Sequence, residues 1–516
     1  MTLGPGQVPP RPLMREAARA RRRARAARRL SVTVDAASEA VGPTPHDRRD
    51  GSGAAALAVN ATAPVPAAPV TEPVTVPNGR SRRRARDGRV GRASGMRAPW
   101  RFSLSAGARR ELLWITVVYL AARAAVLIAA VLLDAFGHHN LQNELAHWDG
   151  LWYRDVADNG YPHHIAHPYH QDNLGFFPLY PLTIFAGTRV LEGLGFHHQI
   201  WSASVAAVLI SGIGGWIATV FVHRLAEGWW DRSTARRATA LFVVFPGAVV
   251  FSMGYSEGLL LPLTTICIWA LERRRWVLAG SVAAFGTAVQ PVGLMLSVVC
   301  GVCALRELWI GGLSERHLGR ALRSRDFRMS VLTTAMSGIG ALSFMAFLWA
   351  WTGNPMANYY AQHHGWGEKT DPIALVHLVT REAPRFDPSH FNSPVSAHVC
   401  MRSAQWMAWC QHNRIDLNDV SGFVGAILMA YELWLLWRYR RELSLPAIAW
   451  TLIITFLAFT SEYVPPNPRM QITAFPMLVL IARRVRSQRF APILYLNAVL
   501  LVGMGLLTFY QHVLRP

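Results

Sequence analysis

The stretch "LLWITVVYLAARAAVLIAAVLL", residues 112–133, decides the class of fold that this chain adopts. As a helix it is long enough to cross the roughly 30 Å hydrocarbon core of a bilayer. Similar apolar runs recur to the C-terminus, and 52% of the 516 residues are hydrophobic while 16% are charged. The sequence therefore predicts an all-α polytopic membrane protein rather than a chain of soluble domains.

The first 110 residues differ in composition from the rest. They hold 22 Arg against 7 Asp and Glu, with many Ala, Pro, Gly and Ser and few large apolar side chains. Such a segment cannot bury a core, so residues 1–110 are predicted to be a disordered cytoplasmic tail and residues 111–516 the membrane domain. The arginine clusters could bind nucleic acid or anionic lipid. No motif calls for a nucleic-acid partner, and the simpler interpretation is a tail that enforces topology.

Later arginine clusters mark the loops that should face the cytosol, because Arg concentrates on that side of membrane proteins. These clusters lie at residues 223–237, 272–275, 306–328, 438–442 and 483–489. With the N-terminus inside, the helix at about 112–134 leads outwards. The loop that follows it, about 135–200, is then extracytoplasmic.

The apolar run at 176–192 conflicts with a simple alternation of crossings. If it and the run at 201–222 both crossed the membrane, the arginines of 223–237 would lie outside. The first run is short and interrupted by Pro178 and Pro181, so we expect a juxtamembrane or re-entrant helix at the outer surface. About eleven transmembrane helices result, at 112–134, 201–222, 238–255, 256–272, 276–290, 291–306, 330–352, 418–437, 444–461, 471–484 and 490–511.

Two further features follow from this topology. The pair of runs around "VQPVG" (289–293) is short for two crossings and could be a broken helix pair lining a cavity. The C-terminus and a large loop at about 353–417 lie outside the cytosol. Cys400 and Cys410 fall in that loop, where a disulfide is permitted.

The segment "HWDGLWYRDVADNGYP" (147–162) places three carboxylates just beyond the first membrane helix. Its apolar side chains recur at helical spacing and predict an amphipathic helix at the membrane surface. Asp149 stands at the N-terminal end of that helix, and two roles are open. It could be an N-cap whose carboxylate accepts a backbone N–H, or a general base for a sugar hydroxyl. Asp155 and Asp158 are expected to be solvated.

A second acidic candidate lies in "FPGAVVFSMGYSEGLLLPL" (245–263), where Glu257 stands at an outer helix end in an apolar stretch. A carboxylate near membrane depth is costly unless it is paired or hydrated, so Glu257 is a functional candidate. The alternative role is an N-cap or a first-turn charge of the next helix.

A basic candidate lies in "SEYVPPNPRMQITAFPML" (461–478), where Arg469 stands outside, against the general charge bias. It is expected to pair with an anion. The anion is either a lipid phosphate held by guanidinium hydrogen bonds or Glu462 in a structural ion pair. Together with "FFPLYP" (176–181), all these motifs converge on the outer face.

No nucleotide-sugar motif or His/Asp metal spacing is evident, so no cofactor and no metal are expected. The histidine-rich "YPHHIAHPYH" (161–170) is the feature that argues otherwise, and it is interpreted as a polar interfacial loop.

The motifs, taken in order, resemble the phosphatidylinositol-glycan class V (PIG-V) mannosyltransferases. The resemblance rests on "HWDGLWYRDVADNGYP", "FFPLYPL", "FPGAVVFSMGYSEGLLL", "LAGSVAAFGTAVQPVGL", "TGNPMANYYAQHHGWG" and "PRMQITAFPML". It covers about residues 112–480 and implies a bacterial relative of that family. The implied fold is a GT-C-like bundle with extracytoplasmic juxtamembrane helices.

The resemblance also implies roles for residues. The family's essential acidic residue of the first outer loop corresponds to Asp149, its YSE carboxylate to Glu257, and its arginine before the last FP motif to Arg469. Gln290, which precedes Pro291, departs from the family, whose members usually have Arg or Ser before the corresponding proline. The candidate site therefore has Asp149 as catalytic base, and for substrate binding His147, Trp148, Trp152, Tyr153, Tyr180, Tyr255, Glu257, Gln290 and Arg469.

The predicted function is transfer of mannose from a polyprenyl-phosphate-mannose donor to a glycolipid acceptor, outside the cytosol and among the membrane lipids. Asp149 would act as base and Arg469 would stabilise the leaving phosphate. Two rival classes stay open: a transporter or lipid flippase whose Glu257 and Arg469 line a passage, and a catalytically silent scaffold.

Overall fold

The computed structural model describes residues 105–137, 145–166, 170–196, 199–312, 317–376, 417–461 and 466–509. Within these ranges the chain is helical, and the sole strand-type pairing is an isolated antiparallel bridge between Thr370 and Ser461. The predicted all-α class is therefore confirmed for this part of the chain. Nearly all of the predicted tail, and both Cys400 and Cys410, lie outside the described residues.

The helices follow one another through short links. The first half contains α2 (Ala106–Gly137), α4 (Asp149–Asn159), η1 (Asn173–Gly175), α5 (Leu179–Gly193), α6 (Gln199–Trp229), α7 (Arg232–Val244), η2 (Pro246–Ser252), α8 (Glu257–Glu272) and α9 (Trp276–Thr287). The second half contains η3 (Pro291–Leu294), α10 (Met295–Ile310), α11 (Leu318–Arg323), α12 (Arg325–Ser337), α13 (Ile339–Thr352), α14 (Ala357–Tyr360), the π-helical turn η5 (Ala361–Gly365), α18 (Leu417–Tyr439), α19 (Leu445–Thr460), α20 (Pro468–Thr473), α21 (Pro476–Arg484) and α22 (Ser487–Phe509).

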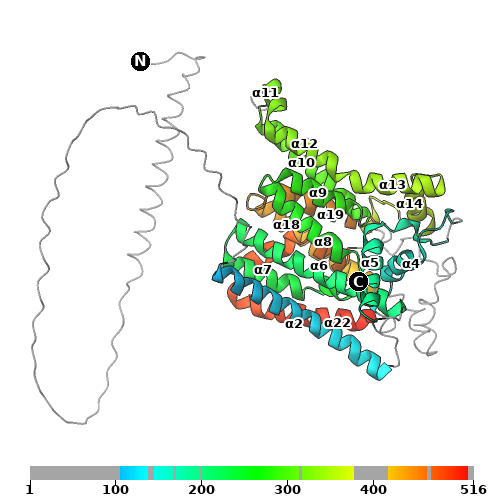
Figure 1. The fold of residues 1–516 in the computed structure, drawn as a ribbon. Helices are drawn as coiled ribbons and strands as arrows, with labels where there is room; N and C mark the ends of the chain where they lie inside the picture. The colour runs from blue at the N-terminus through cyan, green and yellow to red at the C-terminus, as the bar shows by residue number, and fades with distance from the viewer. Residues whose placement is uncertain are drawn as a thin grey trace, which may run out of the picture. The chain divides into compact units, whose positions relative to one another are not determined.

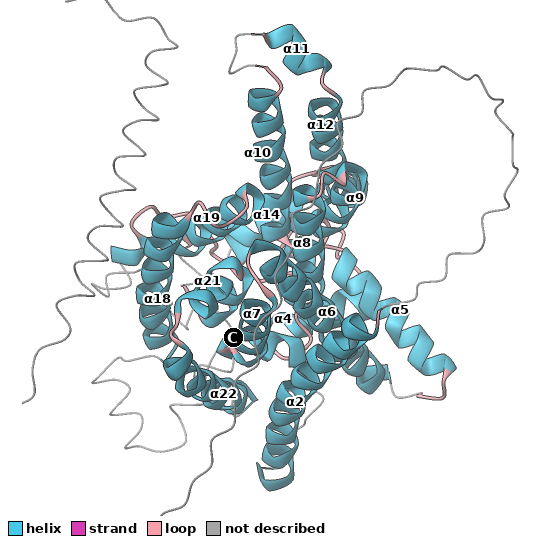
Figure 2. Ribbon diagram, turned by 90° about the vertical axis from the view of Figure 1, so that its left-hand side faces the viewer, coloured by secondary structure: helices cyan, strands magenta, loops and turns pink. Residues whose placement is uncertain are grey.

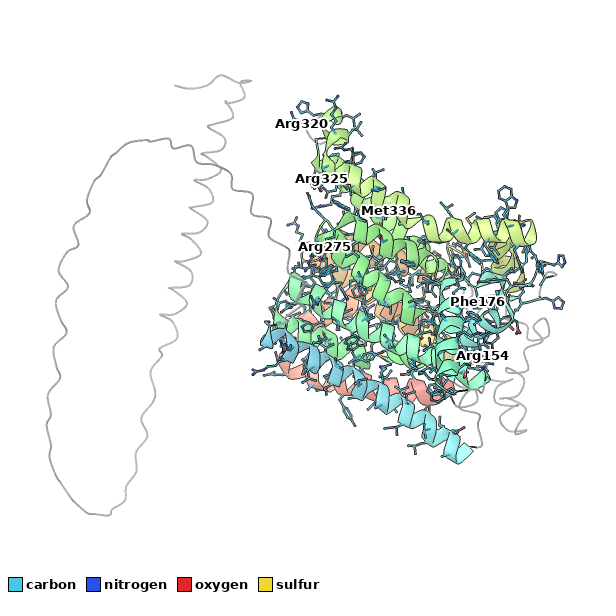
Figure 3. The ribbon with its side chains drawn as sticks, viewed as in Figure 1. Arg154, Phe176, Arg275, Arg320, Arg325 and Met336 are labelled. Atoms are coloured by element: carbon cyan, nitrogen blue, oxygen red, sulfur yellow. The ribbon has the colours of Figure 1, made fainter. Side chains whose placement is uncertain are left out.

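The helices α4, α5 and α14 lie at the end of the membrane domain opposite to Arg275, Arg320 and Arg325 (Figure 1, Figure 3). Figure 1 shows α4, α5 and α14 at one end of the long helices, and Figure 2 shows α10 and α12 projecting with α11 beyond the others. Figure 3 places Arg275, Arg320 and Arg325 at the end away from Phe176 and Arg154. This is the charge asymmetry on which the predicted orientation depends.

A sharp bend separates α7 from η2, whose axes differ by 70°. Pro246, which cannot donate a backbone hydrogen bond, occupies the first position after the break. Arg123, buried in the middle of α2, donates to the carbonyl of Val243 at 2.7 Å, to that of Ala248, and to Ser252 Oγ at 3.2 Å. The guanidinium therefore satisfies a carbonyl at the end of α7 and one in η2, and so holds the bend in place.

Six of the described helices are long and apolar enough to cross a membrane, or seven if the bent α7–η2 pair counts as one span. They lie at Ala106–Ala135, Ser202–Trp229, Pro291–Ile310, Arg325–Thr352, Val420–Tyr439 and Ser487–Phe509. The protein is thus a multi-pass membrane protein. Other predicted crossings are present but short, as in α9 with 12 residues, or split, as in α20 and α21. The number of about eleven crossings therefore stays a prediction.

The two helices predicted to lie at the surface form as separate short elements. α4 has 11 residues and α5 has 15, and neither is among the candidate spans of the described chain. The backbone N–H of Leu179, at the start of α5, donates to the carbonyl of Ala288 at 3.0 Å. This contact sets α5 beside the break in "VQPVG", which the structure forms as the η3 turn between α9 and α10.

Candidate functional site

Asp149 is the first residue of α4 and not its N-cap. The cap position belongs to Trp148, which makes no side-chain cap hydrogen bond and has φ 54° and ψ −123°. A bulky residue at positive φ is strained, and such strain tends to persist where the surrounding structure enforces it. The N-cap interpretation of Asp149 is therefore wrong, because its carboxylate turns instead to a side chain from another helix.

That side chain is Arg469, carried by the short helix α20. Asn467 caps this helix by accepting from the backbone N–H of Met470 at 3.0 Å, and Pro468 occupies its first position. A Cβ added to Gly247 would lie 2.0 Å from the carbonyl oxygen of Pro468. Because Gly247 has no side chain, η2 can touch α20 and bring Arg469 to the site.

Glu257 is the first residue of α8, so it occupies the predicted first turn of that helix. Its side chain also contacts residues from other segments of the chain. The next residue, Gly258, lets α8 approach α6, because a Cβ there would lie 2.3 Å from Ser211 Cα. The side chain of Glu257 is 3% exposed. A carboxylate at this depth needs charged or polar partners.

Arg469 joins the two predicted carboxylates. Its Nη1 lies 2.7 Å from Asp149 Oδ2, its Nε donates to Glu257 Oε1 at 2.7 Å, and its guanidinium lies 5.0 Å from the centre of the Tyr255 ring. Asp149 keeps 29% of its side chain exposed. One cation thus holds two anions, and the three residues predicted to face one another do so. The alternative partner Glu462 lies outside the described residues.

The surroundings fix the charge states of Arg469 and Tyr255. Burial alone would lower the pKa of Arg469, but the carboxylates of Glu257 and Asp149 outweigh it and raise that pKa well above its ordinary value. Burial raises the pKa of Tyr255 well above its usual range, and the negative charge of Asp149 adds to the effect. Arg469 is therefore a permanent cation over a neutral phenol ring.

A chain of hydrogen bonds supports Glu257 from behind. Gln290 Nε2 donates to Glu257 Oε1 at 3.4 Å, and Gln290 Oε1 accepts from Ser256 Oγ at 2.6 Å. Tyr153 Oη in turn donates to Ser256 Oγ at 2.9 Å. Burial raises the pKa of Tyr153 well above its ordinary value, so the phenol keeps the proton that it donates. Gln290 fits this position because its side-chain amide can accept one hydrogen bond, from Ser256, and donate another, to Glu257.

The predicted aromatic platform divides into a buried and an accessible part. Tyr153 and Tyr180 are buried, and Tyr180 Oη lies 2.7 Å from Ser211 Oγ. Trp152 is half-buried; it stacks on Phe176 with a centroid distance of 6.0 Å. His147 and Trp148, edge to face at 5.3 Å, directly precede Asp149 and are also half-buried. Contact of these rings with a sugar remains a prediction.

Sequence reasoning assigned no role to Trp366, which completes this platform. Its ring meets Trp152 edge to face at 5.0 Å, and its Nε1 donates to the carbonyl of Asp172 at 3.1 Å. Five residues on, the N–H of Asp371 donates to the carbonyl of Thr460 at 2.7 Å. The segment around Trp366 therefore links the α4–η1 region to the end of α19. The only signal was the "GWG" of "TGNPMANYYAQHHGWG". Ser256, the middle residue of "YSE", is a second residue of the site to which sequence reasoning gave no role.

Asp155 is a structural residue, which corrects the prediction that it is simply solvated. Its carboxylate accepts from Asn173 Nδ2 at 2.6 Å and from Asn159 Nδ2 at 2.8 Å. The first of these bonds fastens α4 to η1. Asp158 is exposed, as predicted.

In the described part of the chain, no three His, Cys, Asp or Glu side chains are placed to hold a metal ion. In the histidine-rich segment, His163 stacks on Trp351 with a centroid distance of 4.0 Å. The absence of a metal or cofactor requirement stays a prediction.

Comparison with known proteins finds similarity to mannosyltransferases over part of the chain. Residues 118–347 match the family model described as mannosyltransferase (PIG-V), a segment that holds Asp149, Glu257 and Gln290 but not Arg469. GPI alpha-1,6-mannosyltransferase 2 of Cricetulus griseus is 31% identical over 155 residues, and that of Homo sapiens 28% over 160 residues. Each alignment covers 29% of this chain and 30% of the relative. The chain thus spans about a third of the length of the curated relatives that it matches.

Solved structures give a weak likeness. ArnT from Cupriavidus metallidurans bound to undecaprenyl phosphate has a TM-score of 0.41 at 15% identity, covering 77% of this chain and 64% of that one. The apo oligosaccharyltransferase of Archaeoglobus fulgidus has a TM-score of 0.42 at 11% identity, and the match covers 76% of this chain and 56% of that one.

Proposed function

We propose that this protein is a membrane glycosyltransferase that transfers mannose from a polyprenyl-phosphate-mannose donor to a glycolipid acceptor. The observation that carries the proposal is the shared guanidinium of Arg469, which draws Asp149 and Glu257 to one place from distant parts of the chain. The match of residues 118–347 to a mannosyltransferase family model supports mannose as the sugar.

The donor phosphate would compete with Asp149 for Arg469. Nη1 of the guanidinium is taken by Asp149, whereas Nη2 makes no ion pair within the described ranges. A phosphate prefers to bind both terminal nitrogens of an arginine at once. Glu257 would retain the Nε, because it is the more buried of the two carboxylates. Donor binding would therefore release the carboxylate that is to act as base.

The released Asp149 would accept the proton of an acceptor hydroxyl as its oxygen bonds to the anomeric carbon of mannose. The bond from that carbon to the phosphate oxygen breaks, and polyprenyl phosphate leaves with the bonding electrons. Arg469 offsets the charge that grows on the phosphate. Displacement in line converts a β-linked mannosyl phosphate into an α-mannoside. The relatives carry "alpha-1,6-mannosyltransferase" in their names, which is consistent with that outcome.

We also propose a GT-C-like bundle of about eleven crossings with the site outside the cytosol. Carboxylate–arginine contacts join the ends of the described helices that the proposed topology places on the same side of the membrane. Glu111 at the start of α2 meets Arg236 near the start of α7, and Arg274 after α8 meets Glu307 near the end of α10. The arginine-rich end would face the cytosol by the positive-inside rule.

The test uses the purified full chain with polyprenyl-phosphate-mannose and a lipid extract that supplies acceptors. Wild type should release polyprenyl phosphate and form a mannosylated lipid, and Asp149→Asn should bind the donor but form no product. Glycolipid profiling of a deletion strain would identify the acceptor from the truncated lipid that accumulates. Absence of product from wild type, with cellular glycolipids unchanged by Asp149→Asn, would favour a transporter or a silent scaffold.

A further inference from the structure

The carboxylate of Glu257 has one engaged oxygen and one without a donor. Oε1 accepts from Arg469 Nε and from Gln290 Nε2, whereas Oε2 is buried and has no hydrogen-bond partner in the described residues. Native proteins rarely leave a buried acceptor unsatisfied, since the lost hydration is not repaid. An arriving donor at Oε2 would therefore be strongly favoured.

Among the described residues, the amide that reaches Glu257 is held on the other oxygen. Gln290 Nε2 donates to Oε1, and its amide oxygen accepts from Ser256 Oγ, which fixes this orientation. Tyr153 holds Ser256 in turn. A rotation of the amide toward Oε2 would break the bond to Ser256, so within the described residues Oε2 stays open to an arriving group.

Glu257 and Asp149 also lie close enough to contact one small molecule. Both bind the same planar guanidinium, Glu257 through Nε and Asp149 through Nη1, each at 2.7 Å. A small molecule that reaches Arg469 can therefore meet both carboxylates. Asp149 occupies the more exposed side and Glu257 the buried side.

We propose that Glu257 Oε2 accepts a hydrogen bond from a ring hydroxyl of the transferred hexose, which makes Glu257 the residue that selects the donor sugar. The inference rests on the proposed glycosyl transfer. A neutral hydroxyl suits this position, because Arg469 already supplies the positive charge that balances Glu257 and Oε2 lacks only a hydrogen-bond donor within the described residues. A buried charged acceptor also discriminates sharply against a sugar that lacks the matching hydroxyl, since the acceptor is then left unpaired.

The experiment measures binding, so it does not depend on turnover. Short-chain mannosyl phosphates, each lacking one hydroxyl of the sugar, are titrated into the full-length protein in detergent. For wild type, one deoxy analogue should bind about 100-fold more weakly than its parent, as expected for a lost hydrogen bond to a charged group. In Glu257→Ala, parent and analogue should bind within about threefold of each other, because the selecting oxygen is gone. Glu257→Gln, which keeps the shape of the side chain, guards against misfolding and should give an intermediate ratio.

Glu272→Gln at the other end of α8 is the matched control. That carboxylate accepts from Trp229 Nε1 at 2.7 Å, far from the site, so the variant should keep the wild-type ratio. An unchanged ratio in Glu257→Ala, or no sensitive hydroxyl in wild type, would mean that only water meets Oε2 and would overturn the proposal. Mannose transfer by wild type would then still uphold the proposed function. Failure of wild type both to bind mannosyl phosphate and to transfer mannose would overturn both.

Discussion

Two clusters of carboxylates and arginines lie at opposite ends of the membrane domain. In one cluster two arginines contact one carboxylate, and in the other one arginine contacts two carboxylates. At the arginine-rich end, Glu111 accepts from both Arg232 and Arg236, and His223 Nε2 lies 3.6 Å from it. The two arginines are 50% and 47% exposed. At the other end, Arg469 is 18% exposed and serves two carboxylates.

The difference separates a structural cluster from a reactive one. At Glu111 the arginines outnumber the carboxylate, so the carboxylate is fully engaged and the excess positive charge faces solvent or headgroups. At Arg469 the carboxylates outnumber the cation, so a carboxylate can be displaced, and a buried oxygen of Glu257 has no hydrogen-bond partner among the described residues. Four substitutions test this distinction.

Asp149→Asn should have the largest effect, because it removes the proposed base while the Arg469–Glu257 pair remains. We expect transfer to fall roughly 1,000-fold, within the range for general bases, with little change in melting temperature. Glu111→Gln is the counterpart at the structural end. It should lower the melting temperature and leave the rate of transfer within about threefold of wild type. Equal losses of transfer in both variants would erase the distinction between the two ends.

Arg469→Ala should come next, because it leaves Glu257 buried without its cation. We expect a loss of about 3–5 kcal/mol in the free energy of unfolding, measured in mixed micelles. The double variant Arg469→Ala/Glu257→Gln should regain most of that stability but no transfer. Arg236→Ala, whose side chain is 47% exposed, should cost only about 0–1 kcal/mol. A stable single Arg469→Ala variant would show that the site does not depend on this ion pair.

Gly247→Ala should have a smaller effect on stability and a clear one on activity. Its new Cβ would lie 2.0 Å from the carbonyl oxygen of Pro468, so α20 must shift. Overpacking of this kind costs about 1–3 kcal/mol, and displacement of Arg469 should lower transfer by roughly tenfold or more. Gly503→Ala in α22, where the added Cβ meets nothing within 4 Å, should be neutral or slightly stabilising. Similar behaviour of the two variants would argue against the close approach of η2 and α20.

Tyr153→Phe should have the smallest effect. The variant removes the donor to Ser256 and loosens the chain that orients Gln290 and Glu257. We expect a loss of about 1 kcal/mol in unfolding free energy, with a modest fall in kcat and little change in the affinity for the acceptor. Tyr161→Phe, which removes the donor to the carbonyl of Phe176 away from the ion pairs, serves as the control. A larger rate loss in the control would contradict the assignment of Tyr153 to the support of Glu257.

Several features of the fold and the site follow from local sequence. The apolar run at 112–133 is sufficient to predict a membrane helix. The helical spacing of apolar side chains such as Trp148 and Trp152 is sufficient to predict the amphipathic helix α4. The motifs were also sufficient to nominate Asp149, Glu257 and Arg469. The helices form where the sequence predicts them because helix length and helical periodicity are properties of neighbouring residues. The roles of the three nominated side chains stay predictions.

Only the tertiary structure decided how those residues are used. Asp149 pairs with Arg469 rather than capping its helix, Asp155 holds Asn173, and Gln290 links Ser256 to Glu257. Each of these contacts joins separate segments; Arg469 and Glu257 stand 212 positions apart. The sequence by itself determined a multi-pass helical protein with acidic and basic candidates in particular motifs. Their shared guanidinium and the free oxygen of Glu257 were decided by packing, because hydrogen bonds depend on distances that only the folded chain sets.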